Sequence, residues 1–150
     1  MSQSAGNNDT ENSGPDRAFR WPVRVYYEDT DAAGVVYYAN YLRFLERART
    51  EWLRAAGYEQ TRLRAQHGIV FVVRALAIEY VVPARFNDAL EVTVAVTAAR
   101  ASSLELAQSV RRDGLVLVTA TVKIVCVNTA SFKPVRIPPP LLEKLAMGFA

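Results

Sequence analysis

Hydrophobic and polar residues alternate along most of the second half of the chain, which is the pattern of β-strands with one buried face. The clearest run covers residues 89–99, where Leu90, Val92, Val94 and Val96 are separated by polar or small residues. Comparable runs cover residues 69–82, 103–112 and 115–128, and a shorter one covers residues 23–27. Asp113-Gly114, which separates the last two long runs, is typical of a two-residue hairpin turn.

Between Tyr38 and Ala56 the period changes to that of an α-helix. The predicted buried stripe has members three or four residues apart: Tyr38, Tyr41, Leu45, Ala48, Trp52 and Ala55, widened by Leu42 and Leu53. Gly57 is placed to end this helix. Shorter helices are predicted over residues 59–66, closed by Gly68, and over residues 141–147 after three prolines, with a short extended segment at residues 132–137.

The order strand, long helix, then long strands joined by short turns predicts an α+β fold. We expect a mostly antiparallel sheet wrapped around one long central helix, which buries its apolar stripe on one sheet face. A single helix covers such a face poorly and leaves the edge strands open. The chain is therefore expected to associate into dimers or larger homo-oligomers.

Composition narrows the possible functions. The chain has 150 residues, 51% of them hydrophobic, which suits one domain with a full core. Its net charge of +3 comes without a long basic run, so nucleic acid is not an expected partner, whereas an anionic small ligand is. One cysteine and one histidine exclude an intrachain disulfide and a Cys/His metal cluster, and they favour a reducing, cytoplasmic location. No apolar run is long enough to span a membrane.

The first 17 residues are polar and rich in Ser, Asn and Gly. Such a segment buries too little apolar surface to offset the entropy of ordering. Residues 1–17 are therefore predicted to be a disordered tail, and residues 18–150 to be the domain.

The segment YYEDTDAAGVVYYANYLRFLERARTEWLR, residues 26–54, resembles the signature of the 4-hydroxybenzoyl-CoA thioesterase family. It is most similar to the branch of acyl-CoA thioesterases associated with the Tol-Pal envelope system. The stretches FVVRALAIEYVVPARFNDALEV and TATVKIVCVN look like the same branch, so the resemblance covers roughly residues 19–138.

This resemblance implies a hotdog fold, a homodimer or a dimer of dimers (a homotetramer), and hydrolysis of acyl-CoA at a site between subunits. It implies no metal and no cofactor beyond the coenzyme A part of the substrate. Short aliphatic, long aliphatic and aromatic acyl groups are all compatible with the motif.

Asp31 is the predicted catalytic carboxylate. It can attack the thioester carbonyl to form a mixed anhydride or activate a water, and the sequence favours neither route. In the family the residue seven positions later donates its backbone N–H to the thioester oxygen, and here that residue is Tyr38. Family relatives often have histidine there. Gly34 and Val35, between the two, are expected to contact the substrate, since Gly34 permits a tight turn and close approach.

Other residues with reactive or charged side chains are not expected to take part in catalysis. Glu28 and Asp29 are expected to be structural, Glu46 to make a buried polar contact, Cys126 to be a core thiol and His67 to lie on the surface. Basic and hydroxyl residues near strand ends are expected to bind the coenzyme A phosphates. These are Arg100, Ser102 and Ser103, with Arg85 as a further candidate and Arg74 as a residue of the subunit interface.

Two other functions compete with hydrolysis. A binding module would hold acyl-CoA or an acyl carrier protein without turnover. A hotdog hydratase or dehydratase would need a catalytic histidine with a carboxylate, and His67 lies far from the motif in sequence. Release of free thiol and hydration of enoyl-CoA distinguish the three.

Overall fold

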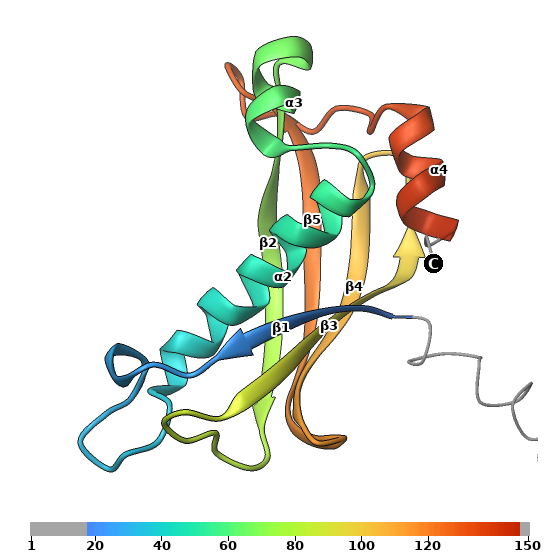
Figure 1. Ribbon diagram of the computed structural model, residues 1–150. Coiled ribbons are helices and arrows are strands. Elements are labelled where there is room, and N and C mark those ends of the chain that lie inside the picture. The colour runs from blue at the N-terminus through green and yellow to red at the C-terminus, as the bar shows by residue number, and fades with distance from the viewer. Residues whose placement is uncertain (1–17, 148–150) are drawn as a thin grey trace, which may run out of the picture.

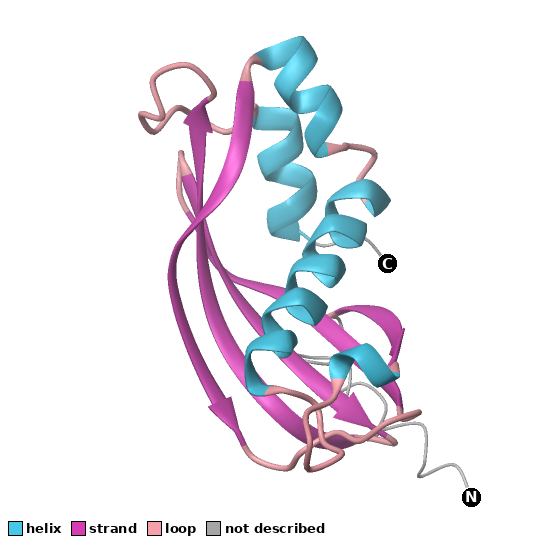
Figure 2. Cartoon of the chain, turned by 90° about the vertical axis from the view of Figure 1, so that its left-hand side faces the viewer, coloured by secondary structure: helices cyan, strands magenta, loops and turns pink. Residues whose placement is uncertain are grey.

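A curved antiparallel sheet with helices on its concave face makes up the chain, as the computed structural model shows over residues 18–147 (Figures 1 and 2). The strands are β1 (Phe19–Arg24), β2 (Ile69–Tyr80), β3 (Ala89–Ala99), β4 (Ser103–Arg112) and β5 (Leu115–Asn128). Their spatial order is β1-β3-β4-β5-β2, with antiparallel neighbours throughout the part described. The predicted tail and the last three residues of the predicted domain lie outside the described residues.

The strand predictions made from alternation are confirmed for the four long strands to within two residues. The first strand lies slightly earlier than predicted, at Phe19–Arg24 instead of residues 23–27. Asp113 (φ 52°) and Gly114 (φ 81°) form the predicted hairpin turn, because both have the positive φ that a type I′ turn requires. The predicted segment at residues 132–137 is reduced to a single bridge between Pro134 and Val127.

The long helix is present in two parts. A 3-10 turn, η3 (Tyr38–Asn40), runs directly into α2 (Tyr41–Ala55). The shorter helices are α3 (Gln60–His67), closed by Gly68 in a left-handed conformation, and α4 (Pro139–Met147). Helix α4 starts two residues before its predicted start.

The predicted buried stripe of α2 is partly wrong. Tyr38, Leu42 and Ala55 are exposed, whereas Phe44, which the predicted stripe does not include, is fully buried. Tyr38 belongs to the 3-10 turn and not to the α-helical face. The face of α2 that packs on β1, β3 and β4 is also rotated away from Leu42 and toward Phe44.

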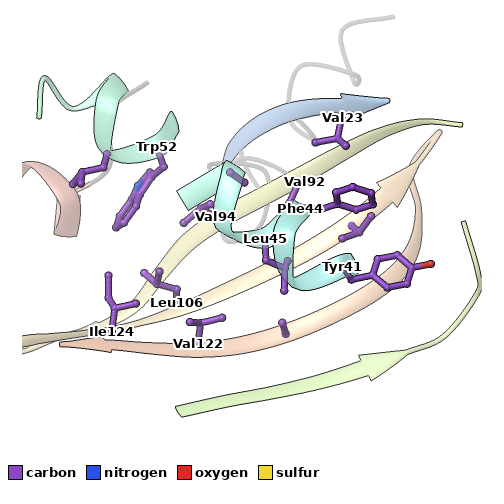
Figure 3. Close-up of a cluster of buried hydrophobic side chains, with 14 of the residues drawn as sticks. Val23, Tyr41, Phe44, Leu45, Trp52, Val92, Val94, Leu106, Val122 and Ile124 are labelled. Carbon is purple, nitrogen blue, oxygen red and sulfur yellow. The ribbon is translucent and has the colours of Figure 1, made fainter. Parts of the chain in front are cut away.

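The core lies between α2 and the middle of the sheet. Phe44 and Leu45 project from α2 toward Val92 and Val94 of β3 and Leu106 of β4 (Figure 3). All five side chains are at most 1% exposed. Burying them stabilises the fold by about 1.5–3 kcal/mol for each large side chain.

Strand β2 differs from the others because it is an edge strand and α2 leaves it largely uncovered. Three of its apolar residues are well exposed: Val73 at 48%, Leu76 at 39% and Tyr80 at 46%. Leu76 pairs with Val122 and Val73 with Ile124, whose side chains belong to the core, so both lie on the concave face. The concave face of β2 therefore presents apolar surface that α2 of the same chain does not bury.

Candidate active site

The loop between β1 and α2 carries Asp31 and is tied to the body of the protein. Thr30 and Val36 form a bridge across it, and the Val36 N–H donates to the Ala84 carbonyl oxygen at 2.8 Å. Val35 makes a second bridge with Arg85. These bonds fix the backbone on both sides of Asp31.

Gly34 closes a tight turn within this loop. Its N–H donates to the Asp31 carbonyl oxygen at 3.0 Å, and the Asp31 N–H donates to the Val35 carbonyl oxygen at 2.9 Å. Gly34 has φ 81°, a conformation that favours glycine. The space that a Cβ atom would occupy at this position is open, with no atom from beyond its two chain neighbours within 4 Å. The tight turn predicted at Gly34 is confirmed, and its surroundings leave room for another molecule.

The Asp31 side chain is exposed at the start of this turn. Its Oδ1 accepts a hydrogen bond from the Ala33 N–H at 2.8 Å, which fixes the orientation of the carboxylate. No described residue donates a hydrogen bond to Oδ2. The carboxylate is thus oriented through one oxygen and has the other free to act as nucleophile or base.

Tyr38 begins η3, and its N–H has no carbonyl partner among the described residues. This is the normal state of the first N–H of a helix. Its side chain is 62% exposed, so the interpretation of Tyr38 as a core aromatic is wrong. Its carbonyl oxygen accepts a hydrogen bond from the Tyr80 hydroxyl at 3.2 Å, and the two rings meet edge to face. Sequence reasoning missed Tyr80 because nothing local links a strand end to a helix start 42 positions away.

Asp29 is a structural carboxylate, as the sequence predicts. It is 5% exposed, and its Oδ2 accepts a hydrogen bond from the Tyr26 N–H at 2.8 Å. Its Oδ1 accepts one from the Asn40 side-chain amide, which ties the loop to the start of α2. Glu28, by contrast, is exposed.

We expect Asp29→Ala to lower the free energy of unfolding by about 1–3 kcal/mol, because it removes the buried acceptor of two partly buried hydrogen bonds, from Tyr26 and Asn40. Urea denaturation measures the change. Glu28→Ala is the matched control, with an expected change within about 0.5 kcal/mol, since Glu28 is exposed. Equal stability of the two variants would contradict the structural role of Asp29.

The residues assigned to the coenzyme A phosphates are not close to Asp31 within one chain. Arg100 and Ser102 lie in the β3–β4 turn and Ser103 is the first residue of β4; Arg100 is exposed and the serines are half-buried. The Asp31 loop follows β1, whose Arg24 pairs with Ala89 at the opposite end of β3. Since β3 has 11 residues, these ends are roughly 35 Å apart along the strand. Arg85 lies beside the Asp31 loop through its bridge to Val35.

The remaining titratable residues of interest lie outside the loop. Cys126 is fully buried, as predicted, and burial raises the pKa of its thiol to about 11. His67 is exposed at the end of α3. Glu46 is also exposed, which corrects the predicted buried contact. Over residues 18–147, no group of three or more His, Cys, Asp or Glu side chains is placed to hold a metal ion.

Comparison with known proteins places this loop and fold in one family. The family model described as the thioesterase-like superfamily matches residues 25–145. The chain belongs to the thioesterase-like superfamily. The match begins at the end of β1 and extends into α4, so it includes the Asp31 loop.

Among its relatives, the acyl-CoA thioesterase YbgC of Haemophilus influenzae is 47% identical over 123 residues, which cover 82% of this chain and 90% of that protein. The acyl-CoA thioester hydrolase YbgC of Escherichia coli O6:H1 is 49% identical over 121 residues, 80% of this chain and 90% of that protein. The crystal structure of a probable thioesterase from Bartonella henselae superposes with a TM-score of 0.78 at 35% identity, over 81% of this chain and 99% of that one.

These relatives confirm the α+β hotdog fold predicted from the resemblance. Figure 1 shows a long helix wrapped by an antiparallel sheet. This arrangement superposes on the structure of the probable thioesterase from Bartonella henselae. Within the described residues, no helix is long and apolar enough to cross a membrane.

Proposed function

We propose that this protein hydrolyses acyl-CoA thioesters to a free acid and coenzyme A, with Asp31 as the catalytic carboxylate. The observation that carries the proposal is the Asp31 side chain, which is exposed, oriented by the Ala33 N–H and free at Oδ2. It stands in the loop directly before the start of the long helix. The activity named for the YbgC relatives, at 47% and 49% identity, supports this function.

The Tyr38 N–H supplies the second requirement of the reaction. Hydrolysis places negative charge on the thioester oxygen, and a fixed N–H donor lowers the energy of that state. The Tyr38 N–H has no competing acceptor in the described structure, and it carries the partial positive charge of a helix start. Gly34 and Val35 lie between this donor and Asp31 and are the proposed contacts for the thioester.

We infer that the active form is a dimer that pairs two copies of β2. An edge strand with free backbone groups pairs readily with another strand. Two identical strands related by a two-fold axis must run antiparallel. Therefore the Tyr80 end of one β2 lies beside the Ile69 end of the other, and the apolar concave face of β2 is brought against a second subunit. The exposed Arg74 lies at the bulge in the middle of this edge.

This arrangement accounts for the separation of the predicted site residues. The Asp31 loop lies at the Tyr80 end of the sheet, since the Tyr80 hydroxyl binds the Tyr38 carbonyl oxygen. The β3–β4 turn lies at the Ile69 end, where Ser103 pairs with Val125 and Ile69 with Asn128. In an antiparallel pair, Arg100, Ser102 and Ser103 of one copy come to the same end as Asp31 of the other. They are the proposed contacts for the coenzyme A phosphates.

We expect the protein to remain a homo-oligomer when it is diluted. The substitution Val73→Lys is expected to weaken the association of its subunits. A lysine on the exposed edge strand opposes strand pairing. Leu115→Lys is a matched control, because Leu115 is 50% exposed and Val73 is 48% exposed, yet Leu115 lies beside the β4–β5 hairpin on an interior strand. Light scattering measures the molar mass at each dilution, and thiol release measures the activity of the same sample. An active species at 16.7 kDa would contradict the dimer.

The finer parts of the proposal rest on the resemblance to the Tol-Pal branch. They are a dimer of dimers as the assembled form, a cytoplasmic location, a role linked to the Tol-Pal envelope system, and acyl carrier protein as a second carrier of the acyl group. Native mass measurement tests the first, and cell fractionation the second. Co-purification with Tol-Pal proteins tests the third, and turnover of acyl-loaded carrier protein the fourth.

The decisive experiment is release of free thiol from a panel of acyl-CoA substrates. Hydrolysis releases one thiol for each acyl group, whereas a binding module gives saturable binding with no thiol. Enoyl-CoA hydration without thiol release would instead indicate a hydratase.

A further inference from the structure

Arg49 is a half-buried cation on α2 without an acidic partner. Its Nη1 donates to the Gln108 Oε1 at 3.0 Å. No carboxylate of residues 18–147 forms an ion pair with it, and the exposed Glu46 one turn earlier is the acid whose charge acts on it. Burial lowers the pKa of the guanidinium, and the charge of Glu46 only partly opposes this effect.

Gln108 cannot neutralise this charge. It is 3% exposed, and its side-chain nitrogen donates to the carbonyl oxygens of Leu45 and Thr93 at 3.1 and 3.2 Å. These bonds orient its amide so that the oxygen faces Arg49. The arrangement holds the guanidinium in one place, but it supplies no negative charge. A guanidinium that is partly removed from water and has no ion-pair partner is unfavourable, so an anion that reaches Arg49 would gain a charge-assisted hydrogen bond.

A hollow of about 340 Å³ lies in front of Arg49, between α2 and the first half of β2. Six of its ten lining residues are apolar, with Trp52, Phe71 and Val73 among them, and Glu46 lines it beside Arg49. Methylene groups suit these walls, and an anionic group suits the guanidinium. The hollow therefore has the chemistry to hold an apolar chain that ends in a carboxylate.

The dimer described above brings this hollow to the catalytic loop. Phe71 and Val73 belong to the first half of β2, which in the antiparallel pair lies beside the Tyr80 end of the other copy. Within one chain, Arg49 is roughly 16 Å from Tyr38 along the helix axis. In the proposed β2 pairing, an acyl-CoA whose thioester oxygen accepts the Tyr38 N–H of one copy can extend its acyl chain toward the hollow that holds Arg49 of the partner subunit.

We propose that Arg49 is a specificity-determining residue that binds the far end of the acyl group, so that the enzyme prefers acyl-CoA substrates whose acyl chain ends in a carboxylate. This proposal rests on the thioesterase function and on the β2 pairing proposed above. A guanidinium pairs with a carboxylate through two parallel hydrogen bonds, which a terminal methyl group cannot form.

The test compares acyl chains of equal length with and without the terminal carboxylate. Adipoyl-CoA is paired with hexanoyl-CoA, and suberoyl-CoA with octanoyl-CoA, and thiol release gives kcat/KM for each. We expect the wild type to prefer one or both carboxylate-bearing substrates by at least about tenfold, the lower limit for a hydrogen bond between charged groups. Arg49→Met is expected to abolish this preference, mainly through KM, and to retain hydrolysis of hexanoyl-CoA or octanoyl-CoA.

Two further variants test whether the preference depends on the Arg49 guanidinium itself or only on a positive charge on α2. Arg47→Met removes the same charge from an exposed position two residues away, and the preference is expected to survive. Arg49→Lys keeps the charge without the planar fork, and an intermediate preference is expected.

Each outcome has a distinct meaning. Equal or faster hydrolysis of hexanoyl-CoA and octanoyl-CoA by the wild type would overturn the role of Arg49 and leave the thioesterase function intact. A preference that persists in Arg49→Met would do the same. If the wild type releases no thiol from any of the four substrates, both the inference and the thioesterase function fail.

Discussion

Asp31→Asn is expected to lower kcat/KM for acyl-CoA by about 100-fold or more, the range for removal of a positioned catalytic carboxylate. The amide has nearly the shape of the carboxylate, and its oxygen can still accept the Ala33 N–H that orients Asp31. It cannot serve as nucleophile or general base. The loop should therefore keep its conformation while the reaction loses its reactive group.

The measurement is thiol release at several substrate concentrations, with the melting temperature recorded for each variant. Glu28→Gln is the matched control, because it removes an exposed carboxylate three residues earlier and is expected to change activity little. Near-normal turnover in a folded Asp31→Asn protein would refute the assignment. It would direct attention to Glu46, the exposed acid on α2.

Tyr38→Pro is expected to be nearly inactive, while Tyr38→Phe retains most of the activity. Proline removes the N–H that is proposed to bind the thioester oxygen, and loss of one such donor costs about 100-fold in rate. Phenylalanine removes only the hydroxyl. Tyr38→His is expected to be tolerated as well, since it keeps the N–H.

The local backbone is favourable for the proline variant. Tyr38 is the first residue of η3, a position where proline is readily accepted. Tyr37, which precedes it, has φ −60° and ψ 131°, the extended conformation that a residue before proline prefers. No carbonyl of the described residues accepts the Tyr38 N–H, so the substitution breaks no such bond.

Thiol release and melting temperature are measured for all three variants. A Phe variant as inactive as the Pro variant, with both folded, would mean that the hydroxyl takes part in the reaction. The exposed Tyr38 side chain would then be a second catalytic group beside Asp31.

Local patterns in the sequence were enough to predict most of the helices and strands. Alternation located β2 to β5 to within two residues, because side chains on a strand face opposite sides and only one side is buried. Asp113-Gly114 predicted the hairpin because few other residues adopt two consecutive positive φ angles. The tight turn at Gly34 was predictable for the same kind of reason, since it depends on residues close together in the chain. The catalytic role of Asp31 came from the family resemblance and stays a prediction.

Only the tertiary structure decided which segments meet. The phase of the buried stripe on α2, with Phe44 inside and Leu42 outside, depends on which strands α2 packs against. The hydrogen bond from Tyr80 to Tyr38 and the pairing of Arg49 with Gln108 join residues 42 and 59 positions apart. The position of β2 at the sheet edge and the distance between Arg100 and Asp31 follow from the strand order β1-β3-β4-β5-β2. Periodicity reports only which side of an element is apolar, and many sheet orders would bury the same side.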